Sequence, residues 1–250
     1  MTVLVEQRDA VTVVTINRPE ARNALDAETM AGIGEALVAA DQNVDVRAVV
    51  LTGAGDRAFC AGMDLRAFAA GGRVVDESRP GLEVFTEQVF PKPIIAAVNG
   101  AAVAGGFELV LACDLVVAAE HARFGLPEVK RGLVAAGGGT NLPRRIPLAL
   151  ALELALTGDL FDAARAQQLG LVNRVVPGER VLDEAIALAT AIARNGPLAL
   201  RVTKELLVAQ ARGAGRAEIA AVTAPVFASA DAKEGAVAFA EKREPRWTGA

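Results

Sequence analysis

Two glutamates, twenty residues apart, are the side chains of this sequence best suited to proton-transfer chemistry. Glu108 lies in the segment AAVAGGFELVLACD, and Glu128 lies in FGLPEVKRGL. An acid among apolar neighbours is expected on or near a buried face, where its charged form is costly without partners. Such carboxyls can act as general acids and bases, although each one also fits a paired structural carboxylate.

Two bends built from small residues could supply backbone donors near these acids. The bend Ala61-Gly62 precedes Met63, and Gly105 opens the segment that carries Glu108. The first N–H groups of a helix and its positive dipole end attract negative charge. Two such donors from separate segments would form an oxyanion hole, although each bend alone also fits close packing.

A third glycine pattern points to a different chemistry. Residues 53–58 read GAGDRA after an apolar run, which fits the dinucleotide fingerprint G-x-G-x-x-A, and Asp76 follows about twenty residues later. That fingerprint requires its glycines to open a long helix, whereas Gly62 soon interrupts the following segment. We therefore interpret residues 53–58 as a tight turn.

Composition indicates a compact globular protein and excludes several classes. Of 250 residues, 52% are hydrophobic and 22% are charged, which argues against disorder. The 26 basic and 30 acidic residues are well mixed, so a nucleic-acid surface is not expected. Cys60 and Cys113 have apolar neighbours and are expected to be buried thiols, and the single histidine makes a zinc site improbable.

The N-terminal residues carry polar and acidic side chains where a secretory signal would be basic and then apolar. The most apolar run, residues 94–103, contains Asn99 and Gly100 and is too short to span a bilayer. We therefore expect a cytosolic protein without a membrane segment.

Hydrophobic periodicity predicts an α/β core. Alternation predicts a strand over residues 11–17, and helical spacing predicts a helix over residues 27–42 with Asp26 as its N-cap. Continuous apolar runs predict buried strands at 47–52, 93–98 and 115–119, with a short buried helix at 105–113.

The second half of the chain is predicted to be mainly helical. Residues 70–80 are polar and lack periodicity, so we expect a loop that could close over a ligand. Helices are predicted at 147–156, 162–169, 178–195, 198–211, 217–230 and 232–242, with a brief strand at 171–176. We expect a core over residues 1–195 and a helical region over 196–250, whose alanine- and valine-rich faces suggest self-association.

Several motifs together resemble one family. NRPEARNAL, AFCAGMDL, KPIIAAVNGAAVAGGFELVLACD, FGLPEVKRGL and the terminal AFAEKREPRW are similar, in order and spacing, to the crotonase or enoyl-CoA hydratase/isomerase superfamily, from about residue 5 to the end. GFEL and EKREPRW most resemble a branch with crotonobetainyl-CoA hydratase and several actinobacterial enoyl-CoA hydratases. The resemblance implies a crotonase-like spiral of ββα turns, a C-terminal helical region for oligomerisation, and a trimer or dimer of trimers.

The resemblance also implies roles for four residues. The backbone N–H groups of Met63 and Gly105 would bind the oxygen of a coenzyme A thioester and stabilise its enolate. Glu108 would activate a water and Glu128 would supply a proton, although a coupled pair could share these roles.

For the coenzyme A moiety, the resemblance implies Arg22 on the phosphate side, backbone contacts from Ala24 and Ala61, and Lys242 as a further base that could reach a neighbouring subunit. Asp64 is a candidate substrate contact, but a structural role is the simpler interpretation for Asp64, as it is for His121. No cofactor is expected apart from the coenzyme A of the substrate.

The leading hypothesis is therefore an enoyl-CoA hydratase that adds water across the double bond of a trans-2-enoyl-CoA. The alternatives are a 3-enoyl-CoA isomerase, which would need only Glu128, and a noncatalytic acyl-CoA-binding protein. Ala135-Ala136 replaces the Pro-Gly found in many hydratases, so the loop beside the acyl group is expected to differ. Acyl length, branching and product stereochemistry are not encoded in any motif.

Overall fold

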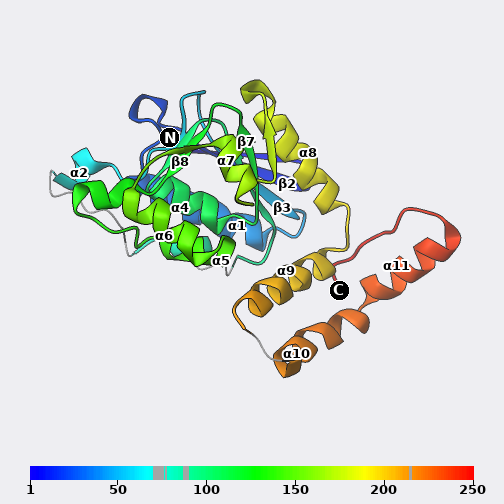
Figure 1. The fold of residues 1–250 in the computed structure, drawn as a ribbon. Helices are drawn as coiled ribbons and strands as arrows, with labels where there is room; N and C mark the ends of the chain where they lie inside the picture. The colour runs from blue at the N-terminus through cyan, green and yellow to red at the C-terminus, as the bar shows by residue number, and fades with distance from the viewer. Residues whose placement is uncertain (70–75, 77, 87–89, 214–215) are drawn as a thin grey trace.

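The computed structural model describes residues 1–69, 76, 78–86, 90–213 and 216–250 (Figure 1). The strands are β1 (Val3–Arg8), β2 (Val11–Ile16), β3 (Ala48–Gly53), β4 (Ala58–Cys60), β5 (Ile94–Val98), β6 (Ala101–Val103), β7 (Leu115–Ala119), β8 (Arg123–Gly125), β9 (Phe161–Asp162) and β10 (Arg174–Val176).

The α-helices are α1 (Ala27–Gln42), α2 (Leu65–Ala69), α3 (Glu83–Thr86), α4 (Gly105–Ala112), α5 (Leu142–Arg145), α6 (Leu148–Thr157), α7 (Ala163–Gln168), α8 (Val181–Ala193), α9 (Pro197–Ala211), α10 (Arg216–Phe227) and α11 (Ala230–Glu241). Short 3₁₀ helices span Pro19–Ala21, Pro127–Arg131, Gly139–Asn141 and Gly178–Arg180.

Two sheets form the core. The larger sheet has the strand order β1-β2-β3-β5-β7-β10, in which only the β1–β2 pair is antiparallel. The smaller sheet has the order β4-β6-β8-β9, with β4, β6 and β8 parallel. The pairs β3/β4, β5/β6 and β7/β8 each place one strand in the larger sheet and the next strand in the smaller one. This repeated crossing is the spiral that the resemblance implied.

Apolar strands explain why the larger sheet lies inside the molecule. Every residue of β3 and β5 is buried, as expected for parallel strands covered on both faces. Helix α8 packs across β2, β3, β5 and β7, and α1 packs against β1 and β2. Helix α4 contacts β4 and β6 of the smaller sheet.

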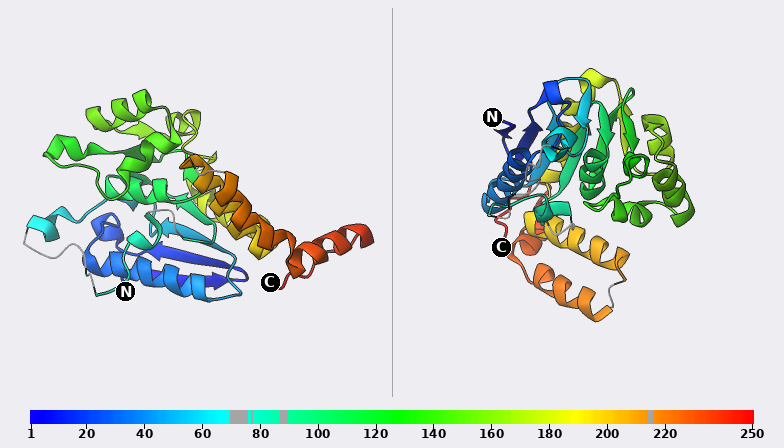
Figure 2. Two further views of the ribbon diagram at one scale, coloured as in Figure 1. Left: turned by 90° about the horizontal axis from the view of Figure 1, so that it is seen from below. Right: turned by 90° about the vertical axis from the view of Figure 1, so that its left-hand side faces the viewer.

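The last three helices lie apart from this core. Figures 1 and 2 show α9, α10 and α11 extending away from the two sheets, with the C-terminus returning to the start of α9. The return is fixed by Trp247, whose ring N–H donates to the carbonyl of Arg194 at 2.7 Å, and by Asp231, which accepts from the N–H groups of Thr248 and Gly249. Leu207, Phe227 and Phe239 remain exposed on these helices.

The buried or periodic elements match the sequence predictions, whereas the exposed strand β1 and the three-residue strands β4, β6 and β8 were not predicted. Helix α1 has the predicted bounds, and the Asp26 carboxylate caps it by accepting from the N–H of Thr29. Strand β1 was not predicted, because all its residues but one are exposed or polar and it lies at a sheet edge. The strand predicted over 171–176 is confined to Arg174–Val176, and the predicted loop at 70–80 lies largely outside the described residues.

Within the described residues, the helices are all too short or too polar to cross a bilayer.

Candidate active site

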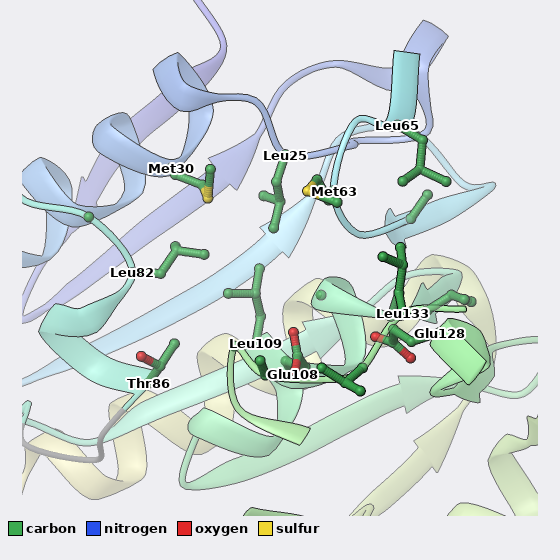
Figure 3. Close-up of a pocket in the computed structure, with 18 of the residues that line it drawn as sticks. Leu25, Met30, Met63, Leu65, Leu82, Thr86, Glu108, Leu109, Glu128 and Leu133 are labelled. Carbon is green, nitrogen blue, oxygen red and sulfur yellow. The ribbon is translucent and has the colours of Figure 1, made fainter. Parts of the chain in front are cut away.

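Both glutamates line one cavity of about 480 Å³. Its remaining wall is mainly apolar and includes Leu25, Met30, Leu65, Leu82, Leu109 and Leu133 (Figure 3). Figure 3 shows Thr86 and Leu82 on one side of Glu108, and Leu65 and Glu128 on the other. The sequence prediction that the two acids share a site is therefore consistent with their placement.

Glu108 lies on the buried helix α4. Its neighbour Phe107 packs edge-on against Phe124 of β8 and Phe161 of β9, with ring centroids 5.7 Å apart in each pair. Such aromatic contacts stabilise the packing beyond simple burial by about 0.5–1.5 kcal/mol. The cluster fixes α4 against the smaller sheet and so sets the direction of the Glu108 side chain.

Glu108 is buried, with only 8% of the residue exposed. Burial raises its pKa above the ordinary value, and the nearby charge of Glu128 adds to the rise. Hydrogen bonds from the backbone N–H groups of Gly139 and Gly137 act against this rise and lower the pKa. The N–H of Gly139 donates to Oε1 of Glu108 at 2.8 Å. Burial is the largest of these effects, so the proton is bound more tightly than by a free glutamate.

A run of three glycines gives the Glu108 carboxyl its room. A methyl group on Gly137 would lie 2.8 Å from Oε2 of Glu108, and one on Gly139 would lie 2.5 Å from the methyl of Ala135. Ala136 lines the cavity, and Ala135 packs against the core. An added methyl would therefore meet the carboxyl most closely at Gly137, while one at Gly139 would lie 3.3 Å from Oε1.

Glu128 lies in the 3₁₀ helix Pro127–Arg131 and is half-buried. Burial raises its pKa, while its own backbone N–H and the charge of Arg131 act in the other direction. Its Oε2 is buried without a hydrogen-bond partner in the described part of the chain. A buried polar atom without a partner is costly, so this oxygen is available to a proton, a water or a substrate.

Two backbone N–H groups face the same cavity. Leu25 and Met63 form an isolated parallel bridge, in which Leu25 donates to Gly62 and accepts from Asp64. The bridge therefore leaves the N–H of Met63 unused, and Gly105, as the first residue of α4, also has no intrahelical partner. A methyl on Gly105 would lie 3.6 Å from the Met63 nitrogen, so the two residues lie close together at the wall of the cavity.

The approach of these donors depends on two unusual backbone positions. Gly62 has a φ of +87°, and a methyl there would lie 2.9 Å from the Gly105 nitrogen. Ala104, directly before Gly105, has φ 53° and ψ −128°, a conformation that disfavours a residue with a side chain. Its N–H donates to the carbonyl of Gly125 at 2.9 Å, which helps to hold the strained position.

Arg18 links two segments near Met63: the one around Leu25, which is bridged to Met63, and the one that begins at Asp64. Its guanidinium donates to the carbonyl of Ala24 at 2.6 Å and to Asp64 at 3.0 Å, and it pairs with Asp26 at 3.1 Å. The Asp64 carboxylate also accepts from the N–H groups of Arg66 and Ala67 at the start of α2, and these bonds together lower its pKa. Arg18 was missed in the sequence, since nothing in its spacing predicts a partner 46 residues away.

The predicted coenzyme A contacts fall in different places. Ala61 lines the cavity, but its N–H is bonded to the carbonyl of Arg22 at 3.1 Å. Arg22 itself is exposed and has a left-handed backbone, and Ala24 is buried. The structure does not bring Lys242 to this cavity, because it ends α11 in the helical region that extends from the core (Figure 1).

The remaining candidates have structural surroundings. Asp64 does not line the cavity, and its carboxylate is engaged by Arg18 and α2. His121 is exposed, with a ring nitrogen 3.1 Å from the carbonyl of Asp56. Cys60 and Cys113 are buried free thiols, as predicted, and burial raises the pKa of Cys60 to about 12.

The possible dinucleotide fingerprint is a turn. Strand β3 ends at Gly53, and the chain then enters β4 at Ala58 instead of a helix. No helix N-terminus is available there for a pyrophosphate, so the interpretation of residues 53–58 as a tight turn is confirmed.

The spiral of ββα turns is a crotonase-type fold, and Glu108, Glu128, Met63 and Gly105 line one of its cavities. The family model described as enoyl-CoA hydratase/isomerase matches residues 6–250. The chain belongs to this family, the crotonase family, as its motifs had indicated.

Relatives and solved structures agree over nearly the whole chain. A carnitinyl-CoA dehydratase from Proteus mirabilis is 40% identical and covers 97% of this chain and 96% of its own. The crystal structure of an enoyl-CoA hydratase from Mycobacterium tuberculosis H37Rv has a TM-score of 0.94 at 54% identity, covering 100% and 99% of the two chains. A carnitinyl-CoA hydratase from Mycobacterium avium has a TM-score of 0.79 at 43% identity, with the same coverage.

Proposed function

We propose that this protein is an enoyl-CoA hydratase, which reversibly adds water to a trans-2-enoyl-CoA to give a 3-hydroxyacyl-CoA. The observation that carries the proposal is the presence of Glu108 and Glu128, both with raised pKa values, in the cavity that Met63 and Gly105 also line. The names of its relatives support it, because a dehydratase removes the water that a hydratase adds.

In the proposed reaction, the thioester oxygen accepts hydrogen bonds from Met63 and Gly105. One carboxylate takes a proton from a water while the water oxygen bonds to the β carbon and the π electrons move to the thioester oxygen. The resulting enolate is stabilised by the two N–H groups, and each donor of this kind commonly contributes about 10²–10³ in rate. The second carboxyl then gives its proton to the α carbon, and the carbonyl re-forms.

The family resemblance assigns the water to Glu108 and the α-carbon proton to Glu128. The fixed Glu108 carboxylate suits the orientation of a water, and the unpartnered Oε2 of Glu128 suits an acid that holds and releases a proton. Because two adjacent carboxyls titrate as a pair, the macroscopic pKa values belong to both. Coenzyme A enters as part of the substrate, and we propose Arg22 and the Ala61 segment at its end of the cavity.

The loss of enoyl thioester absorbance tests the proposal. Purified protein should remove the absorbance of crotonyl-CoA and of longer or branched 2-enoyl thioesters, at different rates. The proposal fails if the absorbance of every thioester in the panel stays unchanged at a protein concentration that binds them.

A further inference from the structure

Ala104 has a backbone conformation that normally belongs to glycine. Its φ of 53° and ψ of −128° match the first central position of a type II′ turn, where a Cβ atom is crowded and glycine is preferred. Arg22 and Lys242 also have positive φ, but their ψ values of 36° and 42° place them in the left-handed helical region, which residues with side chains do visit. Ala104 is therefore strained in a way that these two residues are not.

The peptide bond between Ala104 and Gly105 has a contact on each side. The carbonyl of Ala104 accepts from the N–H of Phe107 at 2.8 Å and from the N–H of Glu108 at 3.0 Å, so it points into the first turn of α4. In a trans peptide the carbonyl and the following N–H point in opposite directions. The N–H of Gly105 therefore points away from α4, where Ala104 and Gly105 line the cavity. The ψ angle of Ala104 sets the orientation of this peptide, and with it the direction of the Gly105 donor.

Contacts from two other segments hold Ala104 in place. Its N–H donates to the carbonyl of Gly125 at 2.9 Å, which continues the pairing of β6 with β8. Its methyl lies next to Gly62, because a methyl built on Gly62 would be only 2.8 Å from the Cβ atom of Ala104. Gly62 directly precedes Met63, so the Ala104 methyl lies between the two segments that carry the proposed donors. Strained residues persist where their surroundings fix them on several sides, and they cluster at active sites.

We infer that Ala104 is a positioning residue: its methyl keeps the 104–105 peptide from turning, which fixes the Gly105 N–H toward the thioester oxygen and lowers the stability of the fold. Glycine would adopt the same φ and ψ without strain, but it would also reach other conformations readily. Alanine reaches fewer of them, and its methyl has Gly62 beside it. The role rests on the proposed function for its substrate, although stability and the state of a bound carbonyl can both be measured without turnover.

Ala104→Gly separates the two effects. Relief of the strain should raise the midpoint of thermal unfolding by a few degrees, although the greater chain entropy of glycine offsets part of the gain. The kcat for crotonyl-CoA hydration should fall by about tenfold with little change in KM, because the donor acts mainly on the enolate. Ala104→Ser retains the Cβ atom and should keep most of kcat. Asp9→Gly, at a φ of 51° between β1 and β2, lies outside the cavity lining and should leave kcat unchanged.

The infrared carbonyl band of bound butyryl-CoA, isotope-labelled at the thioester carbonyl, reports the donors directly. This saturated thioester has no double bond to hydrate. Hydrogen bonds from the two N–H groups should lower the frequency of its carbonyl in the wild type. Ala104→Gly should lose part of this shift or broaden the band, and Ala104→Ser should keep it.

The positioning role is overturned if Ala104→Gly is less stable than the wild type, or if it keeps the wild-type carbonyl band. Hydration at the wild-type rate by Ala104→Gly would also overturn this role while leaving the proposed reaction intact. A more stable Ala104→Gly with an altered carbonyl band, in a protein that hydrates none of the thioesters tested, would support the positioning role and contradict the proposed reaction.

Discussion

The backbone N–H of Gly139 donates a 2.8 Å hydrogen bond to Oε1 of Glu108. This bond ties the acid on α4 to a glycine loop that follows it by 31 residues, so the loop sets the position of the carboxyl. Oε2 of Glu108 faces Gly137, where there is no room for a side chain. The position of the Glu108 carboxyl thus depends on Gly137 and Gly139, which have no side chains and act only through their backbone.

Gly137→Ala should displace the Glu108 carboxyl, because the new methyl would lie 2.8 Å from Oε2. We expect kcat for enoyl-CoA hydration to fall by about ten- to a hundredfold, since a misplacement of about 1 Å can have an effect of that size. Ala136→Gly, in the same loop, removes a methyl and is the matched control for loop flexibility. Wild-type turnover in Gly137→Ala, with the fold confirmed by circular dichroism, would show that the position of this carboxyl is not critical.

The pH dependence of stability should report the buried acid. A carboxyl with a raised pKa binds its proton more tightly in the folded protein, so the free energy of unfolding falls as pH rises from 4.5 through the raised value. Glu108→Gln lacks this titration and should gain stability relative to the wild type across that range. Urea unfolding at several pH values measures the difference, with Glu153→Gln, exposed on α6, as the control substitution. A difference that shrinks with rising pH would contradict the raised pKa.

Arg18→Lys should loosen the segments around Met63. An ammonium group cannot reproduce the planar contacts to Ala24, Asp26 and Asp64 together. We expect a loss of about 1–3 kcal/mol in the free energy of unfolding and a fall in kcat larger than the rise in KM. Denaturation and steady-state kinetics measure the two effects. A destabilised variant with unchanged kcat would limit Arg18 to a structural role.

Asp231→Ala should release the C-terminal tail. The buried carboxylate accepts from Thr248 and Gly249, and the nearby Trp247 is the only tryptophan in the chain. Loss of these bonds should expose the indole, shift its fluorescence to longer wavelength and lower the stability by about 1–3 kcal/mol. Asp183→Ala, an exposed acid on α8, is the control. Unchanged emission in Asp231→Ala would mean that Trp247 is held without this carboxylate.

The sequence predicted the parts of the fold in which the pattern is long and apolar. Strands β3, β5 and β7 and helices α1 and α4 were found because their burial is continuous or periodic. Strand β1 escaped because its side chains are mostly exposed, and β4, β6 and β8 are only three residues long. Three residues are too few for a period to be seen.

The acids and the N–H donors could be named from motifs, whereas their supports could not. Gly139 and Arg18 act on Glu108 and Asp64 through contacts between distant parts of the chain. The run of three glycines at 137–139 can be seen in the sequence, but its spacing does not indicate that Gly139 bonds to Glu108.

The measurement that tests the central claim most directly is the hydration of crotonyl-CoA by Glu108→Gln and Glu128→Gln, compared with the wild type. Each substitution keeps the size of the side chain and removes a group that can exchange a proton. If both acids act on one water, each variant should lose about 10²–10⁴ in kcat while it still binds the thioester. Near wild-type hydration by Glu108→Gln, with the loss confined to Glu128→Gln, would contradict the paired mechanism.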